Sequence, residues 1–270
     1  MFGISEGGYG SQRLASYYAD YWAGVGPMAG GEPLKNAPVE NCANLAFSFL
    51  TGAMDEGFYR NKLTGYTKTA FDSLQAKYAG RLMNHSADSL FRHRIELIPN
   101  CGHSIDYSLT TPWLKTYKRN PYPHTLMWED YPMDGQRRQS FYNLYVMQRP
   151  KAADGLKDAS GEDRDYYEMD IQNNVIRLSV KKVTYQTVER DPVYGIDLKF
   201  TKSYHPVSGG KWKIYLNDQL VDMNKPVTVF INDRKAFEGK IVPRMEDMIT
   251  SCMEYFDPCR VFPASVDVAL

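Results

Sequence analysis

The sequence predicts an α/β region followed by an all-β region. As far as about residue 110, short apolar runs alternate with helix-like stretches, a pattern typical of a parallel sheet with helical crossovers. From about Pro121 onward, apolar residues recur with period two, and turn residues separate the runs. We therefore expect an α/β domain over residues 1–120 and an antiparallel β-sandwich domain over residues 121–270.

Three apolar runs in the first region predict buried strands, because each is short and ends at residues that break regular structure. The expected strands are Trp22–Met28, Asn44–Leu50 and Arg94–Ile98. Helix-like segments lie before and between these runs, at Gln12–Tyr18, Leu63–Tyr78 and Ser86–Arg92.

The clearest strand of the second region is Val175–Lys182, in which apolar and polar residues alternate. One face of this strand would carry Ile176, Leu178 and Val180, and the other Arg177, Ser179 and Lys181. Further strands are expected at Phe141–Met147, Ile196–Phe200, Trp212–Leu216, Val227–Ile231 and Val266–Leu270. Turn residues connect them at 208–210, 217–218 and 232–233, and the polar stretch Lys151–Asp165 predicts a long mobile loop near 150–165.

The composition is that of a folded protein without a strong charge bias. The chain has 270 residues, of which 43% are hydrophobic, and its 32 basic side chains balance its 32 acidic ones. That balance argues against a surface that binds nucleic acid or an anionic membrane. No apolar run approaches the roughly 20 residues of a membrane helix, and no signal-peptide pattern follows Met1. The four cysteines form no CxxC pair, which argues against a zinc-finger type of metal site.

One short motif near residue 5 indicates a nucleophile. Gly3-Ile4-Ser5-Glu6-Gly7 matches G-x-S-x-G, the pattern of a serine held in a sharp turn between a strand and a helix. The turn requires small residues two before and two after the serine, so Gly3 and Gly7 are the expected elbow glycines. The helix would direct its first N–H groups, that of Glu6 included, toward an oxyanion. A glycine-rich turn without chemistry is the alternative, so the serine needs partners.

Two residues further along the chain are suitable partners for this serine. A nucleophile elbow is followed in the chain by an acid and then a histidine. Asp55 comes shortly after the apolar run that ends at Leu50, and His103 comes shortly after the run that ends at Ile98. Ser5, Asp55 and His103 thus have the right residue types, in the right order, each just beyond a predicted strand.

Other residues of the same types are weaker candidates. Glu56 neighbours Asp55 and is an alternative for the acid. Four histidines lack a strand-then-glycine context and are interpreted as surface or packing residues: His85, His93, His124 and His205. Asp106 follows His103 too closely to act as an independent acid, and Cys101 is interpreted as a small buried thiol.

Together these motifs resemble the catalytic half of an α/β-hydrolase. The resemblance is carried by Gly3–Tyr9, by Thr51–Asp55 with Tyr59–Asn61, and by Asn100–His103. It is greatest to the serine esterases and peptidases of the dienelactone-hydrolase or prolyl-oligopeptidase-like group. The later segments Arg119–Pro123, Trp128, Phe141–Tyr142, Val227–Asn232 and Phe256–Leu270 resemble members that carry a C-terminal β-sandwich.

The resemblance implies a serine hydrolase that cleaves a carboxylic ester or a peptide through an acyl-enzyme. Ser5 would attack the acyl carbon, His103 would accept its proton, and Asp55 would orient the imidazole. Such chemistry needs no metal and no organic cofactor. The expected partner is a small-molecule ester or peptide, carbohydrate-linked esters included, and not a nucleic acid or a membrane.

The resemblance also implies that part of the hydrolase domain lies outside these residues. In the family the elbow follows the fifth strand of the sheet, whereas only four residues precede Ser5 here. The chain would then lack the N-terminal half of that domain and one oxyanion donor, and we expect residues 1–270 alone to show little esterase activity.

A second hypothesis makes the protein a binding protein with a vestigial hydrolase half. The β domain would then bind a glycan or a protein partner on exposed aromatic side chains. The candidates for such a platform are Tyr204, Trp212 and Tyr215.

Overall fold

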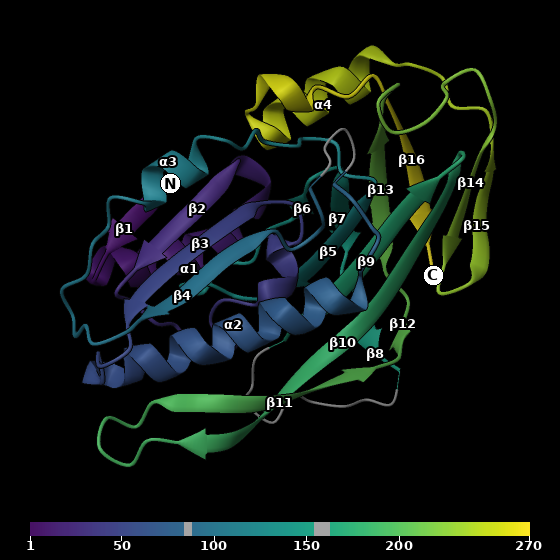
Figure 1. The fold of residues 1–270 in the computed structure, drawn as a ribbon. Coiled ribbons are helices and arrows are strands. Elements are labelled where there is room, and N and C mark those ends of the chain that lie inside the picture. Colours follow the sequence, from purple (N-terminus) through teal and green to yellow (C-terminus); the bar gives the residue numbers. More distant parts are fainter. Residues whose placement is uncertain (84–87, 154–162) are drawn as a thin grey trace. The chain divides into compact units, whose positions relative to one another are not determined.

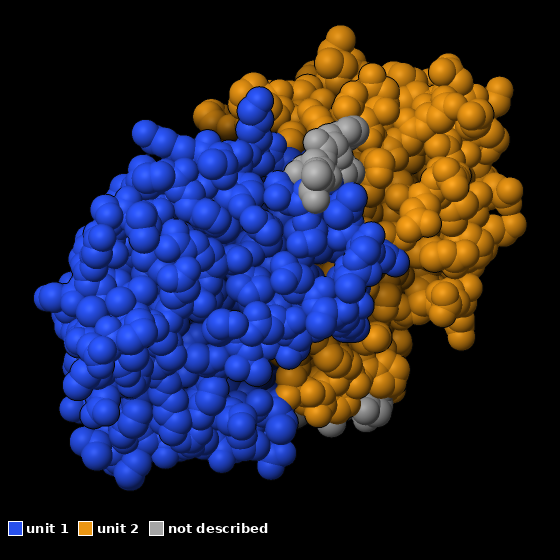
Figure 2. All heavy atoms as spheres, in the orientation of Figure 1, with its two compact units in different colours: residues 1–120, 185–201 blue, residues 121–184, 202–270 orange. Residues whose placement is uncertain are grey.

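The computed structural model describes residues 1–83, 88–153 and 163–270, which form two compact units, coloured separately in Figure 2. The first unit comprises Met1–Asn120 and Tyr185–Thr201, and the second comprises Pro121–Thr184 and Lys202–Leu270. Helices and several sheets make the chain a mixed α and β protein. The sequence interpretation placed residues 185–201 in the second domain, whereas their contacts group them with the first unit.

A four-stranded parallel sheet forms the centre of the first unit (Figure 1). Its strands follow the order of the chain: β1 (Phe2–Ile4), β2 (Gly24–Met28), β3 (Ala46–Gly52) and β4 (His93–Ile98). Strands β2 and β3 are buried along their whole length, as expected for parallel strands covered on both faces. Because parallel strands end at the same edge of a sheet, the residues that follow β1, β3 and β4 are brought close together.

Three α-helices connect or cover these strands. Helix α1 (Glu6–Tyr17) joins β1 to β2, α2 (Arg60–Lys77) joins β3 to β4, and α3 (Thr110–Leu114) follows β4. The 3-10 helices η1 (Ala19–Tyr21), η2 (Val39–Cys42) and η3 (Gly57–Tyr59) lie in the connections. Helix α1 packs closely on β2 at Gly8, where an added Cβ would overlap the carbonyl oxygen of Met28. Helix α3 packs against Gly24 and Gly26 of β2 through Leu114.

The first unit differs from the sequence prediction at two places. The predicted helix Ser86–Arg92 does not form: residues 88–92 are not helical, and residues 84–87 lie outside the described residues. An isolated bridge pairs Leu82 with Ser89 instead. The short helix α3 was not expected, because a five-residue segment offers too few positions to show a helical period.

Two larger sheets and one small sheet make up most of the second unit. The six-stranded sheet contains β5 (Thr125–Asp130), β9 (Asp165–Gln172), β10 (Val175–Arg190), β11 (Asp197–His205), β14 (Val227–Ile231) and β15 (Arg234–Gly239). The four-stranded sheet contains β6 (Ser140–Phe141), β7 (Leu144–Gln148), β13 (Lys211–Leu216) and β16 (Ala264–Ala269). The small sheet pairs β8 (Lys151–Ala152) with β12 (Val207–Ser208), and α4 (Met245–Tyr255) and η4 (Pro258–Arg260) precede β16.

Aromatic side chains from the two larger sheets pack against one another in the core of the second unit. The ring centroids of Tyr167 on β9 and Trp212 on β13 are 6.3 Å apart, and those of Trp128 on β5 and Phe141 on β6 are 5.4 Å apart. The apolar face predicted for β10 is buried, at Ile176, Leu178 and Val180. A tight turn at Asn232 and Asp233, both with positive φ, joins β14 to β15 as the sequence predicts for that pair of residues.

Three features of the second unit were not anticipated. Strand β10 pairs with β14 in a parallel direction, although the other pairs of the six-stranded sheet with a defined register are antiparallel. The expected strand Phe141–Met147 is divided into β6 and β7 by a turn at Tyr142, whose φ is 51°. The predicted loop Lys151–Asp165 begins in β8 and ends in β9, and its residues 154–162 lie outside the described residues.

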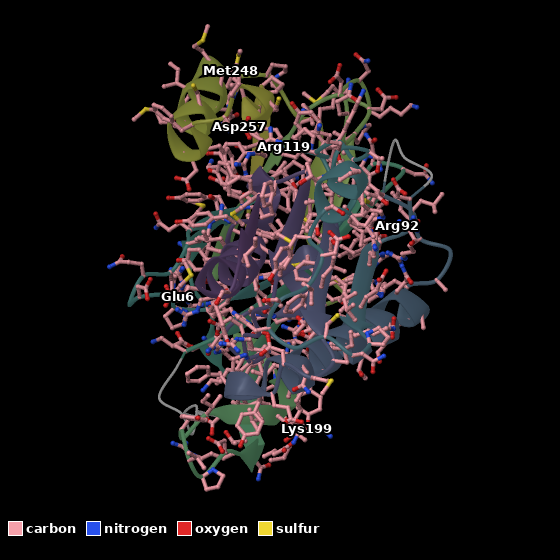
Figure 3. All side chains as sticks on the ribbon, turned by 60° about the vertical axis from the view of Figure 1, so that its left-hand side comes forward. Glu6, Arg92, Arg119, Lys199, Met248 and Asp257 are labelled. Carbon is pink, nitrogen blue, oxygen red and sulfur yellow. The ribbon has the colours of Figure 1, made fainter. Side chains whose placement is uncertain are left out.

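Helix α4 was not identified from the sequence, because the buried face of this helix is mostly polar and its exposed face is apolar. Its buried residues are Asp247, Ser251 and Tyr255, whereas Met248 and other apolar side chains of the helix are exposed (Figure 3). Apolar periodicity therefore does not mark the packed face. Among the residues that the structure describes, no helix is both long and apolar enough to cross a membrane.

Candidate active site

Ser5 lies in a sharp turn between β1 and α1. Its backbone adopts φ 57° and ψ −116°, a conformation that non-glycine residues rarely take. Its N–H donates to the carbonyl oxygen of Met28 at 2.9 Å, and its own carbonyl accepts from the N–H groups of Gly8 and Tyr9. These bonds hold the serine at the end of β1 and at the start of α1.

The turn requires a glycine at one of the two predicted positions. An added Cβ at Gly3 would overlap the carbonyl group of Gly7, whereas an added Cβ at Gly7 would meet no atom within 4 Å. The structure therefore differs from the sequence expectation at Gly7, because only Gly3 is sterically confined. Gly8, which the motif does not include, is also sterically confined.

We expect Gly3→Ala to destabilise the fold by about 1–3 kcal/mol, because the new methyl group must displace the backbone of Gly7. Gly7→Ala is the matched control, and it should be neutral or stabilise the first turn of α1 by up to about 1 kcal/mol. Chemical denaturation of the two variants measures the difference. Equal free energies of unfolding would contradict the packing described for this turn.

The loops that follow β3 and β4 lie against each other. The N–H of Ala53 donates to the carbonyl of Ile98, and the N–H of Met54 donates to the carbonyl of Cys101, both at 2.9 Å. The approach at Gly52 is so close that an added Cβ would overlap the carbonyl oxygen of Gly102. This contact between the loops places Asp55 next to the residue that follows Gly102, which is His103.

Ser5, His103 and Asp55 form one chain of hydrogen bonds. The Nε2 atom of His103 lies 3.1 Å from Ser5 Oγ, and its Nδ1 atom lies 2.8 Å from Asp55 Oδ2. The Asp55 side chain is 3% exposed, whereas that of His103 is 46% exposed. The structure thus brings together the three residues that the sequence singled out, with a buried acid and an imidazole open to solvent.

Arg60 is a partner of this group that the sequence interpretation missed. Its Nη1 atom donates to Asp55 Oδ1 at 2.8 Å, so the two carboxylate oxygens of Asp55 have separate partners. The backbone between them passes through Phe58 and Tyr59, both in left-handed conformations. Arg60 was quoted only as part of a motif, because spacing along the chain cannot show that it turns back toward Asp55.

The alternative residues have other partners or surroundings. Glu56 is exposed, and His93 contacts Asp72 through Nε2 and the carbonyl of Phe91 through Nδ1. His124 and His205 contact the Gln219 carbonyl and the Thr184 hydroxyl, respectively. Asp106 accepts from the N–H of Ser108, Cys101 is a free thiol of intermediate exposure, and His85 lies outside the described residues.

A cavity of about 450 Å³ opens beside Ser5. Its walls come from the Ser5 turn and α1, from the loop after β2, from the η3–α2 region and from residue Ile196. All of these residues belong to the first unit. Apolar side chains of this wall, among them Phe58, Leu63 and Ile196, make it suitable for an uncharged group.

Burial affects the ionisation of two polar side chains of this cavity, Glu32 and Tyr9. Glu32 contacts Arg13 at 3.4 Å and accepts from Asn36 at 3.0 Å, and burial raises the pKa of its carboxyl group despite these partners. Burial likewise raises the pKa of Tyr9, against the opposing effect of the Arg60 charge. Tyr9 therefore stays a neutral hydroxyl at neutral pH.

The start of α1 is the place where negative charge could be stabilised. Glu6 is the first residue of this 12-residue helix and lines the cavity next to Ser5. The first N–H groups of a helix have no acceptor within it and carry the positive end of the helix dipole. Figure 3 labels Glu6, whose side chain is exposed, so its backbone N–H is the group relevant to an oxyanion.

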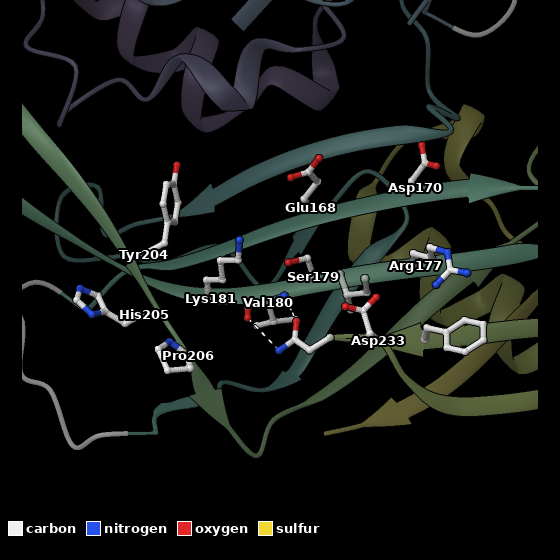
Figure 4. A pocket seen from close by; sticks show the side chains of 13 residues that line it. Glu168, Asp170, Arg177, Ser179, Val180, Lys181, Tyr204, His205, Pro206 and Asp233 are labelled. Carbon is white, nitrogen blue, oxygen red and sulfur yellow. Dashed lines mark hydrogen bonds between the residues drawn. The ribbon is translucent and has the colours of Figure 1, made fainter. Parts of the chain in front are cut away.

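The second unit has a larger cavity, of about 670 Å³, shown in Figure 4. Side chains of β9 and β10 with opposite charges line it, including Glu168, Asp170 and Lys181. Tyr204 also lines it and is 43% exposed. The other two aromatic residues expected on a binding platform, Trp212 and Tyr215, are buried in the core, so that part of the expectation is wrong.

Within residues 1–83, 88–153 and 163–270, no group of three or more histidine, cysteine or acidic side chains is arranged to hold a metal ion. The four cysteines are free thiols. Comparison of the chain with models of known protein families finds no match, and neither does comparison with curated proteins.

Proposed function

We propose that the protein is a serine hydrolase that cleaves a carboxylic ester or a peptide. The observation that carries this proposal is the position of His103, which lies within hydrogen-bond distance of both Ser5 Oγ and Asp55 Oδ2. A hydroxyl, an imidazole and a buried carboxylate in this order can activate an oxygen nucleophile. A cavity beside the hydroxyl gives a substrate access to it.

In the proposed reaction, Ser5 Oγ attacks the acyl carbon while His103 Nε2 takes its proton. Asp55 stabilises the imidazolium, and the Glu6 N–H at the start of α1 donates to the oxyanion. His103 then returns the proton to the leaving group, which departs and leaves an acyl group on Ser5. Water, activated by the same imidazole, releases the acid and restores the serine.

Several features support a relationship to the α/β-hydrolases. The parallel strand order β1-β2-β3-β4, the turn between β1 and α1, and the acid and histidine beyond β3 and β4 are the features that such a relationship predicts. The aromatic contacts between the two sheets of the second unit favour the proposed β-sandwich.

The alternative is a binding protein that uses the cavity of the second unit. The exposed ring of Tyr204 beside acidic and basic side chains is the observation that favours it. A glycan would stack a sugar ring on the tyrosine and bond its hydroxyl groups to the charged side chains. This surface and the Ser5 group involve different residues, so the two functions can be tested separately.

The test is steady-state hydrolysis of a short-chain aryl ester by the protein as its gene encodes it, followed through release of the aryl alcohol. A hydrolase is expected to show saturable turnover. A protein that binds soluble oligosaccharides but releases no alcohol above the uncatalysed rate would favour the binding alternative and contradict this proposal.

A further inference from the structure

Residues 185–201, which we call the 185–201 arm, lie far from Ser5 in the sequence but contribute to the cavity beside it. The arm comprises the end of β10, a turn, and the start of β11, and it belongs to the first unit. Its residue Ile196 lines the cavity together with Ser5. In the sequence the arm stands between two segments of the second unit, and it contributes Ile196 to the lining of this cavity.

Hydrogen bonds and an ion pair fix the arm to η3 and α2. The hydroxyl of Tyr59 donates to Asp191 Oδ1 at 2.6 Å, across 132 positions of sequence. Glu189 accepts from the Tyr66 hydroxyl at 2.7 Å and pairs with the Lys62 ammonium group. The Asp191 residue is 1% exposed, so this anchor is shielded from water.

The turn of the arm is also well defined. The N–H of Asp191 donates to the Ile196 carbonyl at 2.8 Å, and the carboxylate of Asp191 accepts from the N–H of Tyr194. Gly195 has a φ of 68°, which a side chain would disfavour. Lys199, labelled in Figure 3, lies over the ring of Tyr66, 5.6 Å from its centroid. These contacts fix the backbone of the turn that carries Ile196.

Planar groups gather at this side of the cavity. The rings of Phe58 and Tyr194 are 5.0 Å apart, and the guanidinium of Arg60 lies 5.3 Å from the centroid of Phe58. Phe58 is 49% exposed although it is a large apolar side chain, which leaves part of its ring free to pack against a ligand. Rings and guanidinium groups stack well on a flat partner.

We propose that the cavity beside Ser5 binds an aromatic group of the substrate, and that Phe58 and Ile196 determine this specificity. The proposal rests on the proposed hydrolase function and adds the substrate class. An aryl group would lie against Phe58 and Ile196 while its ester or amide carbonyl reaches Ser5 Oγ. The 185–201 arm then has a functional role, which is to complete the binding site for that group.

The test uses three esters: methyl acetate, methyl phenylacetate and benzyl acetate. Methyl acetate has no phenyl ring. Methyl phenylacetate has one on the acyl side of the ester bond, and benzyl acetate has one on the alcohol side. We expect one of the two phenyl esters to exceed methyl acetate in kcat/KM by about tenfold or more. Ile196→Ala should reduce that preference by about tenfold, mainly by raising KM for the phenyl ester.

Two further variants complete the experiment. Ile196→Trp should fill the cavity and remove the preference for the phenyl ester. Val193→Ala is the matched control, because Val193 belongs to the same turn but is 74% exposed and does not line the cavity. Far-UV circular dichroism and thermal unfolding show that each variant is folded, and Val193→Ala should keep the rates of all three esters within about twofold.

The outcomes separate this inference from the proposed function. If the protein as its gene encodes it hydrolyses none of the three esters and no aryl ester, the proposed function fails. If it hydrolyses methyl acetate but shows no preference for a phenyl ester, or a preference that both Ile196 variants retain, the hydrolase proposal stands and this inference is overturned.

Discussion

Ser5→Ala and His103→Ala are each expected to lower kcat for ester hydrolysis by about 10³-fold or more. The physical reason is that His103 Nε2, 3.1 Å from Ser5 Oγ, activates the hydroxyl, so neither group is effective without the other. For the same reason, the double variant should be little worse than either single variant. Steady-state rates with a short-chain aryl ester measure all three effects.

Neighbouring residues provide the controls for this prediction. Ser104→Ala removes an exposed hydroxyl next to His103, and His93→Ala removes an imidazole that contacts Asp72. Both should keep kcat within a few-fold of the unmodified protein. Near-normal turnover by Ser5→Ala would show that the nucleophile lies elsewhere.

Asp55→Asn is expected to lower kcat by about 10³- to 10⁴-fold. The carboxylate accepts from His103 Nδ1 at 2.8 Å, and an amide at this position would disturb the tautomer and provide no charge for the imidazolium. The Arg60 guanidinium, whose side chain is 13% exposed, would also lose its carboxylate partner. The measurement is kcat for the same ester, at a pH where the unmodified protein is most active.

Glu56→Gln is the matched control for Asp55, since Glu56 is the adjacent acid and is exposed. We expect its kcat to stay within a few-fold of the unmodified value. A severe loss in Glu56→Gln together with a mild loss in Asp55→Asn would transfer the role to Glu56 and contradict the geometry of this site.

The sequence indicated the members of the site because each follows a strand of one parallel sheet. Ser5, Asp55 and His103 come just beyond β1, β3 and β4, and strands that run in parallel end at one edge. The order of residue types then restricted the choice among five histidines. Glu56 remained an alternative, since adjacent residues cannot be separated without knowing which side chain turns inward.

Long-range pairing explains what the sequence did not indicate. Ile196 lies far along the chain from Ser5, and only the length and direction of β10 and β11 bring it to the cavity. The alternation in β10 predicted its buried face correctly but contains no information about its parallel partner β14. Glycine is sterically required at Gly3 and Gly8 but not at Gly7. This difference likewise depends on contacts that the motif does not specify.

The most direct test of the central proposal is to locate a covalent serine probe on the protein as its gene encodes it. A small fluorophosphonate reacts with an activated serine, and peptide mass spectrometry identifies the modified residue. We predict one label per chain, on Ser5, that is lost in Ser5→Ala, strongly slowed in His103→Ala and retained in Ser104→Ala. A protein that takes up no label, or takes it up equally in the His103→Ala variant, would contradict the account.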